Sequence, residues 1–230
     1  MIVTGIPVNL LSLRWFSPLV MKTFFQLLSI LFHPLFFAIY LLIFWLVVNP
    51  FAFGFNHWHD ADKLLIYVFV LTLFMPGIII FMMRRLDMIS SISMPTNQER
   101  IGPLIVTFIA YLWVFMNSRN NPDIPDVYTF FIASTVCTLG LLFFLNVLMR
   151  VSIHGAGMGA LATYFLLLNI YYIPFNFSQK WTIWNTSIII IILAGLVGTG
   201  RLYLKKHAWN ELMTGYLVGI LGTLAANLIM

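Results

Sequence analysis

The stretch from residue 185 to residue 230 decides the fold, and it reads NTSIIIIILAGLVGTG-RLYLKKHAWNE-LMTGYLVGILGTLAANLIM. Its two outer parts, 185–200 and 212–230, are apolar runs of the kind that cross a bilayer as helices, which takes about 20 residues. In lipid, every backbone polar group has to be satisfied within the element, so these runs predict helices. The basic junction between them, 201–211, is expected to lie at one membrane face.

The composition of the whole chain points the same way. Of its 230 residues, 61% are hydrophobic and 8% are charged, whereas a soluble domain carries about 25% charge. A soluble protein this apolar would lack the polar atoms to cover its surface. The single cysteine, Cys137, lies in an apolar run, which excludes an intramolecular disulfide framework. We therefore expect an integral membrane protein.

Further apolar runs precede this stretch, and we expect spans at about 34–53, 63–83, 101–117, 127–149 and 155–173. The sequence thus predicts an all-α membrane protein, a single bundle of about seven transmembrane helices over 34–230, within a range of six to eight. The first segment, 1–33, is apolar but interrupted by Pro7, Arg14, Pro18 and Lys22. We expect it to be an interfacial helix or, as the second choice, a re-entrant segment.

Basic residues divide unequally between the two ends of this predicted bundle. One end has Lys63, Arg119 and Lys180. The other end collects Arg14, Lys22, Arg84, Arg85, Arg100, Arg150, Arg201, Lys205 and Lys206. The positive-inside rule places the second end in the cytoplasm, and we expect a bacterial inner membrane. The net charge of +5 is thereby accounted for without a nucleic-acid partner.

The junction after Gly200 carries the clearest chemical pattern. His207 and Glu211 are four residues apart, which places them on one face of a helix. A carboxylate beside an imidazole fixes its tautomer and supports positive charge on it, as a nucleophilic or acid–base histidine needs. Arg201 has to reach the same place from the end of the preceding span. The alternative is a basic flank that faces lipid head groups.

Two other junctions at the same end carry residues of related chemistry. His154 opens the fifth span, where a histidine can lie beside an anion held by the helix N-terminus. The alternative is that Gly155 and Gly159 pack against another helix while His154 is a polar cap. Arg100 opens the third span and can bind a phosphate through two N–H groups. The alternative interpretation is that Arg100 lies at a span end and only extends its charged group to the membrane interface.

Together the three junctions resemble the type 2 phosphatidic acid phosphatase superfamily, whose motifs are K-x6-R-P, P-S-G-H and S-R-x5-H-x3-D. The likeness covers roughly residues 87–222, with the motifs in the same order. Arg100 resembles the arginine of the first motif, and Ser152-Ile153-His154 resembles the core of the second. The third motif is matched by Arg201, His207 and Glu211.

The resemblance implies a lipid phosphate or diphosphate phosphatase that acts through a phosphohistidine and needs neither a metal nor a cofactor. His207 would attack phosphorus and Glu211 would orient it. His154 would protonate the leaving lipid alcohol and then activate water. The phosphate would be bound by Arg100, Arg201 and Ser152. The partner implied is a membrane lipid phosphate whose hydrocarbon chain stays in the bilayer.

The chain also departs from the family's motifs. Ser93 stands at the lysine position of the first motif, and the proline after the arginine is displaced to Pro103. The other departures are Val151 for proline, Ile153 for glycine, Gly200 for serine and Glu211 for aspartate. If another cation replaces the lysine, the candidates are Arg84, Arg85 and Lys205.

The missing lysine motivates a second hypothesis. It is an inactive relative that binds lipid head groups or scaffolds a membrane complex. A transporter is a third hypothesis, because prolines and glycines interrupt several spans, although no inverted repeat supports it.

Overall fold

The computed structural model describes residues 17–171 and 176–230, so predictions that fall on 1–16 or 172–175 lie outside the described residues. Over the described residues the chain is helical, without a strand. The stretches long and apolar enough to cross a membrane are Pro18–Val48, Pro50–Arg85, Asn97–Arg119, Asp126–Leu148, Ile153–Tyr171, Phe177–Tyr203 and Trp209–Ile229. The predicted all-α bundle of seven membrane-spanning helices is confirmed.

The first two of these stretches are each built from several short helices. The first contains α1 (Pro18–Leu31), η2 (Pro34–Phe36) and α2 (Phe37–Val48). The second contains η3 (Pro50–Phe53), η4 (Trp58–Ala61), α3 (Asp62–Phe69), a π-helical turn η5 (Val70–Phe74) and α4 (Met75–Arg85). The predicted boundary at residue 34 coincides with the break between α1 and η2. How α1 sits in the bilayer stays a prediction.

The other five stretches are the single helices α5 (Asn97–Arg119), α6 (Asp126–Leu148), α7 (Ile153–Tyr171), α8 (Phe177–Tyr203) and α9 (Trp209–Ile229). The predicted sixth span, 185–200, lies within α8, but the loop predicted at 174–184 is wrong from Phe177 on, because the helix begins there. Asn176 accepts a hydrogen bond from the Gln179 N–H at 2.8 Å, and the Gln179 side chain accepts one from the Asn176 N–H at 3.2 Å. This reciprocal cap starts the helix inside the predicted loop.

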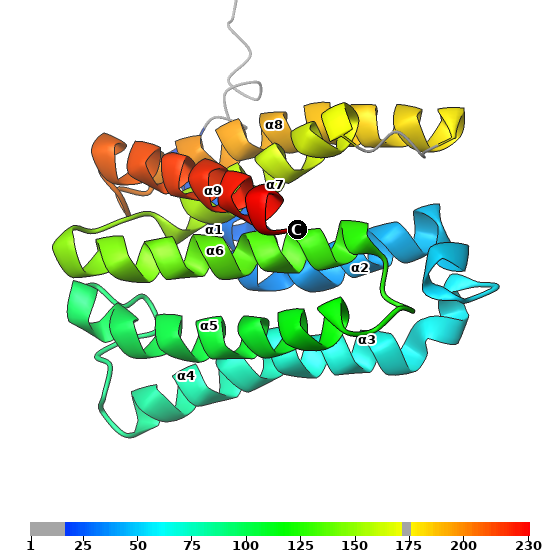
Figure 1. Cartoon of the computed structure of the whole chain (residues 1–230). Helices are drawn as coiled ribbons and strands as arrows, with labels where there is room; N and C mark the ends of the chain where they lie inside the picture. Colours follow the sequence, from blue (N-terminus) through cyan, green and yellow to red (C-terminus); the bar gives the residue numbers. More distant parts are fainter. Residues whose placement is uncertain (1–16, 172–175) are drawn as a thin grey trace, which may run out of the picture.

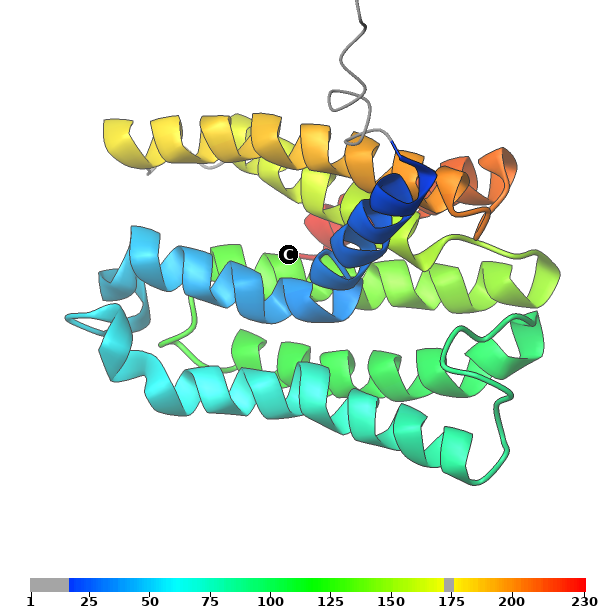
Figure 2. The ribbon, with the colours of Figure 1, turned by 180° about the vertical axis from the view of Figure 1, so that it is seen from behind.

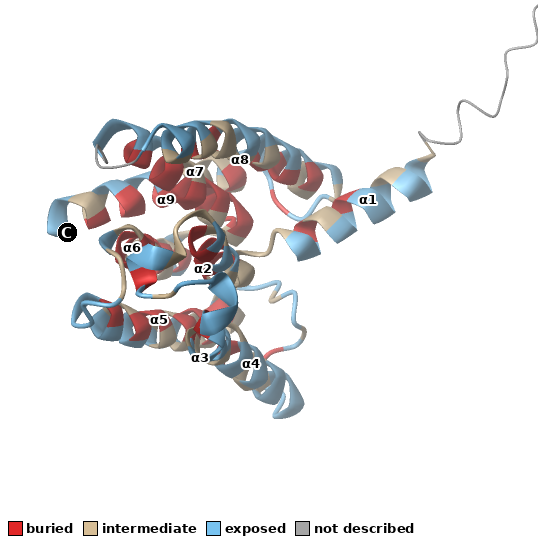
Figure 3. Ribbon diagram, turned by 90° about the vertical axis from the view of Figure 1, so that its right-hand side faces the viewer, coloured by how far each residue is buried: buried red, intermediate tan, exposed pale blue. Residues whose placement is uncertain are grey.

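The helices are arranged in three layers (Figure 1). The helices α7, α8 and α9 form one layer, α2 and α6 the next, and α3 to α5 the third. Helix α1 crosses the others obliquely and packs on α8 (Figure 2). Buried residues gather where α2, α6, α7 and α9 meet, whereas α1 extends away from this core (Figure 3). The outward faces are apolar and exposed, as expected of surfaces that meet lipid.

Glycines allow α7 and α9 to approach until their backbones touch. A Cβ on Gly159 would lie 2.6 Å from the Tyr216 carbonyl oxygen, and one on Gly215 would lie 2.5 Å from that of Ser152. A Cβ on Gly219 would meet the Ala156 carbonyl even more closely. The prediction that Gly155 and Gly159 pack against another helix is therefore confirmed, and that helix is α9. Because α7 carries His154 and α9 carries Glu211, this contact also fixes how far apart those two residues lie.

Replacing Gly219 with alanine should therefore destabilise the protein. The new methyl group would meet backbone rather than a flexible side chain, and such overpacking costs about 1–3 kcal/mol. The matched control is Gly195→Ala on α8, where an added Cβ finds nothing within 4 Å. Thermal unfolding in detergent should give a lower midpoint for Gly219→Ala than for Gly195→Ala, by roughly 2–4 °C for each kcal/mol. Equal midpoints would contradict the tight α7–α9 contact.

Candidate active site

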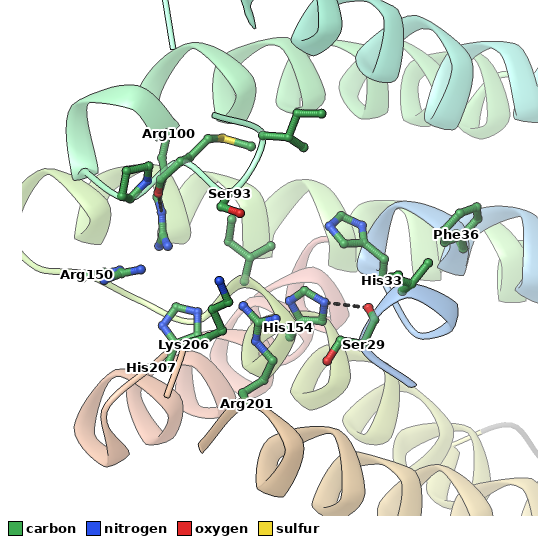
Figure 4. Close-up of a pocket in the computed structure, with 15 residues that line it drawn as sticks. Ser29, His33, Phe36, Ser93, Arg100, Arg150, His154, Arg201, Lys206 and His207 are labelled. Atoms are coloured by element: carbon green, nitrogen blue, oxygen red, sulfur yellow. Dashed lines mark hydrogen bonds between the residues drawn. The ribbon is translucent and has the colours of Figure 1, made fainter. Parts of the chain in front are cut away.

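One end of the bundle gathers the starts of α5, α7 and α9 and the ends of α6 and α8 (Figure 1). A cavity of about 440 Å³ opens there (Figure 4). Its polar lining residues are Ser29, His33, Ser93, Arg100, Arg150, His154, Arg201, Lys206 and His207. The first turns of α5 and α7 contribute Arg100, Ile153 and His154 to the lining. Helix N-termini carry partial positive charge, which favours an anion.

His207 lies in the turn between α8 and α9, and Glu211 lies in the first turn of α9. Nδ1 of His207 is 2.7 Å from Oε2 of Glu211. Because a carboxylate accepts, Nδ1 carries the proton and Nε2 keeps its lone pair. Burial lowers the pKa of His207 to about 4, and the charges of Arg201 and Arg100 act in the same direction, while Glu211 opposes them. At neutral pH the ring is thus neutral with a free Nε2, as a nucleophile needs.

His154 is the second residue of α7 and its side chain is buried. Its Nε2 lies 3.0 Å from the carbonyl oxygen of Ser29, which is 125 positions earlier in the chain and belongs to α1. A carbonyl only accepts, so Nε2–H is the donor, and Nδ1 is the atom that can exchange a proton. His154 is thereby oriented by the backbone of α1, while His207 is oriented by a carboxylate.

The arginines of the cavity differ in how they are held. Arg100 is 4% exposed, and its Nε donates to the Met94 carbonyl at 3.1 Å while Nη1 donates to the Val151 carbonyl at 2.9 Å. These bonds fix the guanidinium and leave Nη2 for a ligand. Nε of Arg201 is buried without a hydrogen-bond partner in the described part of the chain. A buried donor without a protein partner is uncommon, and the Arg201 side chain lines the cavity.

Most of the residues predicted to form a site do come together. Arg100, His154, Arg201 and His207 line the cavity, and Glu211 contacts His207 from behind. Ser152 is fully buried and is absent from the described lining residues. Its hydroxyl accepts from the Gly155 N–H at 3.2 Å, which caps α7. The predicted contact of Ser152 with a phosphate stays a prediction.

Two cations that sequence reasoning did not assign to the site also line the cavity, namely Arg150 and Lys206. Nε of Arg150 lies 4.0 Å from Oε2 of Glu211. Their closeness in sequence to predicted site residues could have indicated them, since Arg150 is two residues before Ser152 and Lys206 directly precedes His207. Ser93, at the lysine position of the first motif, is in the lining as well.

The residues proposed as substitutes for that lysine lie elsewhere. Arg84 pairs with Asp87 at 3.2 Å, and the Arg85 guanidinium lies over the Phe81 ring. Lys205 takes a left-handed backbone conformation, with φ of 52°, in the turn after α8. All three are outside the described cavity lining. Arg150 and Lys206 are therefore the additional cations that line the cavity beside Arg100 and Arg201.

Comparison with protein-family models, with curated proteins and with solved structures finds no match to this chain.

Proposed function

We propose that this protein is a lipid phosphate or diphosphate phosphatase that works through a phosphohistidine and draws its positive charge from side chains. The observation that carries the proposal is the gathering of two oriented histidines and four cationic side chains in one cavity at the end of a membrane bundle. The likeness of the three motifs to the type 2 phosphatidic acid phosphatases supports the same reaction.

In the first step, the Nε2 lone pair of His207 forms a bond to phosphorus while the bond from phosphorus to the bridging ester oxygen breaks. The electron pair of that bond goes to the bridging oxygen, which takes a proton from Nδ1 of His154. This step requires His154 as imidazolium, a form that the negative charge of the bound phosphate stabilises. Glu211, which accepts from Nδ1–H of His207, stabilises the positive charge that develops on this ring. The products are a lipid alcohol and phosphohistidine.

In the second step, a water oxygen bonds to phosphorus and the bond from phosphorus to Nε2 of His207 breaks. The electron pair returns to Nε2, and Nδ1 of His154 accepts the proton of the water. Inorganic phosphate leaves, and both histidines are back in their starting states. His154 thus acts as an acid in the first step and as a base in the second step. Both roles use Nδ1, because Nε2–H is bonded to the neutral carbonyl oxygen of Ser29.

The cationic side chains bind the phosphate and stabilise the transition state. Arg100 and Arg201 each have guanidinium nitrogens that donate to no described residue, and Arg150 and Lys206 lie in the same lining. Positive groups that are already in place where negative charge develops are the largest contributors to many enzymatic rate enhancements. Side chains alone can supply the charge that this chemistry needs.

A mostly apolar cleft adjoins the cavity and supports a lipid substrate. The two share the lining residues His33, Met94, Arg100 and Ile153. Beyond these residues the cleft is lined by side chains of α4, α5 and α6, including Ile80, Leu104, Tyr111 and Leu139. A phosphate held by the arginines would therefore have its hydrocarbon chain beside an apolar wall. We place the cavity on the cytoplasmic side, from the distribution of basic residues.

The proposal predicts phosphate release without added metal. The purified protein in detergent, with EDTA present, should hydrolyse a single-chain lipid monophosphate or a prenyl diphosphate. Glu211→Gln should slow this reaction by about 10²-fold or more, because an amide can hold His207 in the wrong tautomer. Glu211→Asp, which restores the family's residue, is the conservative control and should retain more activity. Head-group binding that depends on Arg100 and Arg201, with no turnover of any substrate, would instead establish the inactive relative.

A further inference from the structure

Helix α1 docks on the rest of the protein along one narrow stripe. It extends away from the core and packs on α8 (Figures 2 and 3). Its buried residues are Phe25 and Ser29, which are four positions apart and therefore share one face of the helix. Its exposed residues are mostly large and apolar, namely Leu19, Val20, Phe24, Leu27, Ile30 and Leu31. The position of α1 thus depends on a few contacts, and Ser29 brings them to the lining of the cavity.

Phe25 occupies a notch at the end of α8, directly beside Arg201 in the sequence. The notch exists because residue 200 is glycine, since a Cβ there would lie 2.8 Å from Cδ1 of Phe25. The Phe25 ring also packs on Tyr203, about one turn further along α8, with 5.2 Å between the ring centres. The third motif of the family has serine at the position of Gly200. Phe25 gives a physical reason for this departure, because a serine side chain would collide with its ring.

The end of α1 leaves one backbone carbonyl for the active site. His33 precedes Pro34 and is extended, with ψ of 132°, so the helix stops at Leu31. The last four carbonyls of a helix have no donor within it. Three of them find donors nearby, namely the Phe32 N–H for Leu28, the His33 N–H for Ile30 and the Tyr40 hydroxyl for Leu31. The fourth belongs to Ser29, and it accepts from Nε2–H of His154 at 3.0 Å (dashed line in Figure 4).

We propose that Phe25 is a positioning residue for the reaction: by seating α1 against Gly200, it holds the Ser29 carbonyl on Nε2–H of His154. This inference rests on the proposed function. With Nε2–H bonded to the carbonyl, Nδ1 is the atom that gives and takes the proton in the two steps. The carboxyl end of a helix also carries partial negative charge, which stabilises the imidazolium that the first step requires. Displacement of α1 would remove both effects.

A displaced α1 should reproduce, on a smaller scale, the loss of His154 itself. Phe25→Ala should slow phosphoenzyme formation from an alkyl monophosphate about tenfold, as the loss of one hydrogen bond would. The same step with 4-nitrophenyl phosphate should change much less, because its acidic leaving group needs no proton. Phe25→Leu keeps a side chain in the notch and should recover much of the rate. Phe24→Ala, on the exposed side of α1, is the control and should leave both rates unchanged. Rapid-quench kinetics measure these rates.

Gly200→Ser restores the family's residue and should nevertheless lower activity. The added side chain would push on the Phe25 ring, so the ratio of the alkyl rate to the aryl rate should again fall about tenfold. The matched control is Gly195→Ser on the same helix, where an added Cβ finds nothing within 4 Å. It should keep the wild-type ratio. A faster reaction of the alkyl phosphate in Gly200→Ser would contradict the proposal.

The Ser29 carbonyl itself is tested by a change in the backbone. An α-hydroxy acid incorporated in place of Ile30 turns the peptide bond after Ser29 into an ester, whose carbonyl is a weaker acceptor. The alkyl rate should fall several-fold while the aryl rate is retained. The same exchange at Leu28 alters the Leu27 carbonyl instead and should not change the ratio.

The two substrates separate failure of this inference from failure of the proposed function. Equal slowing on both substrates in the Phe25, Gly200 and Ile30 variants would mean that these residues act through Arg201 or through the fold. That result would refute the positioning role and leave the phosphatase intact, as would an unchanged ratio in all three. If the wild-type protein releases phosphate from neither substrate, the proposed function is wrong and the positioning role is wrong with it.

Discussion

Replacement of His207 by alanine is expected to lower phosphate release from a lipid phosphate by at least about 10³-fold, as loss of the attacking group does in other enzymes that form covalent intermediates. The free Nε2 of His207 is the atom that would bond to phosphorus, and the hydrogen bond of Nδ1 to Glu211 holds it ready. The measurement is a single-turnover assay in detergent, with the protein in excess over the lipid phosphate and at a saturating concentration. It reports the chemical step rather than product release.

The control for this loss is His59→Ala. His59 is exposed, and it lies in η4, at the other end of the bundle from the cavity (Figure 1). Its removal should leave turnover and thermal stability close to those of the wild type. Wild-type turnover in His207→Ala, with the fold intact, would refute the assignment of His207 as the nucleophile. It would favour the alternative in which the basic junction, 201–211, binds lipid head groups.

The second large loss of activity is expected on replacing His154, and the size of the loss should depend on the acidity of the leaving group. For a lipid alcohol, which leaves poorly unless protonated, His154→Gln should slow formation of the phosphoenzyme by about 10²–10⁴-fold. An aryl phosphate with an acidic leaving group, such as 4-nitrophenyl phosphate, needs no proton at that oxygen. Its first step should therefore be slowed far less, whereas hydrolysis of the intermediate should be slow for both substrates because it needs His154 as a base.

Rapid-quench kinetics with the two substrates measure this difference. An equal slowing of the first step on both would mean that His154 positions the phosphate rather than protonating the leaving group. His33→Asn is an informative companion, because His33 packs on His154 and is not expected to exchange a proton in either step. Its effect should not depend on the acidity of the leaving alcohol.

Much of the fold followed from the sequence because the bilayer leaves few options for a long apolar run. The helices at 97–119, 126–148, 153–171 and 209–229 correspond to runs that the sequence showed directly. The extra two turns of α8 were missed, since the cap made by Asn176 and Gln179 lies in a stretch that reads as polar loop. The start of α8 is set by this pair of local hydrogen bonds, which cannot be predicted from the average hydrophobicity of the stretch.

The candidate site was predictable to the extent that it depends on motif spacing and on the number of crossings. Arg100, His154, Arg201 and His207 open or close helices at the same end, so the alternation of spans was enough to bring them together. The contact of Ser29 with His154 joins residues 125 positions apart, and no spacing rule predicts it. Arg150 was counted among the basic residues of that end, yet only the structure shows it beside Glu211.

The most direct test of this account is a search for phosphate bound covalently to the protein. The His154→Gln variant is mixed with a labelled aryl phosphate and quenched in alkali, which preserves phosphohistidine, and its peptides are then analysed. The account predicts close to one phosphate per protein, located on His207, and none in the His154→Gln variant that also carries His207→Ala. A phosphate on another residue, or turnover of the substrate without any labelled protein, would contradict it.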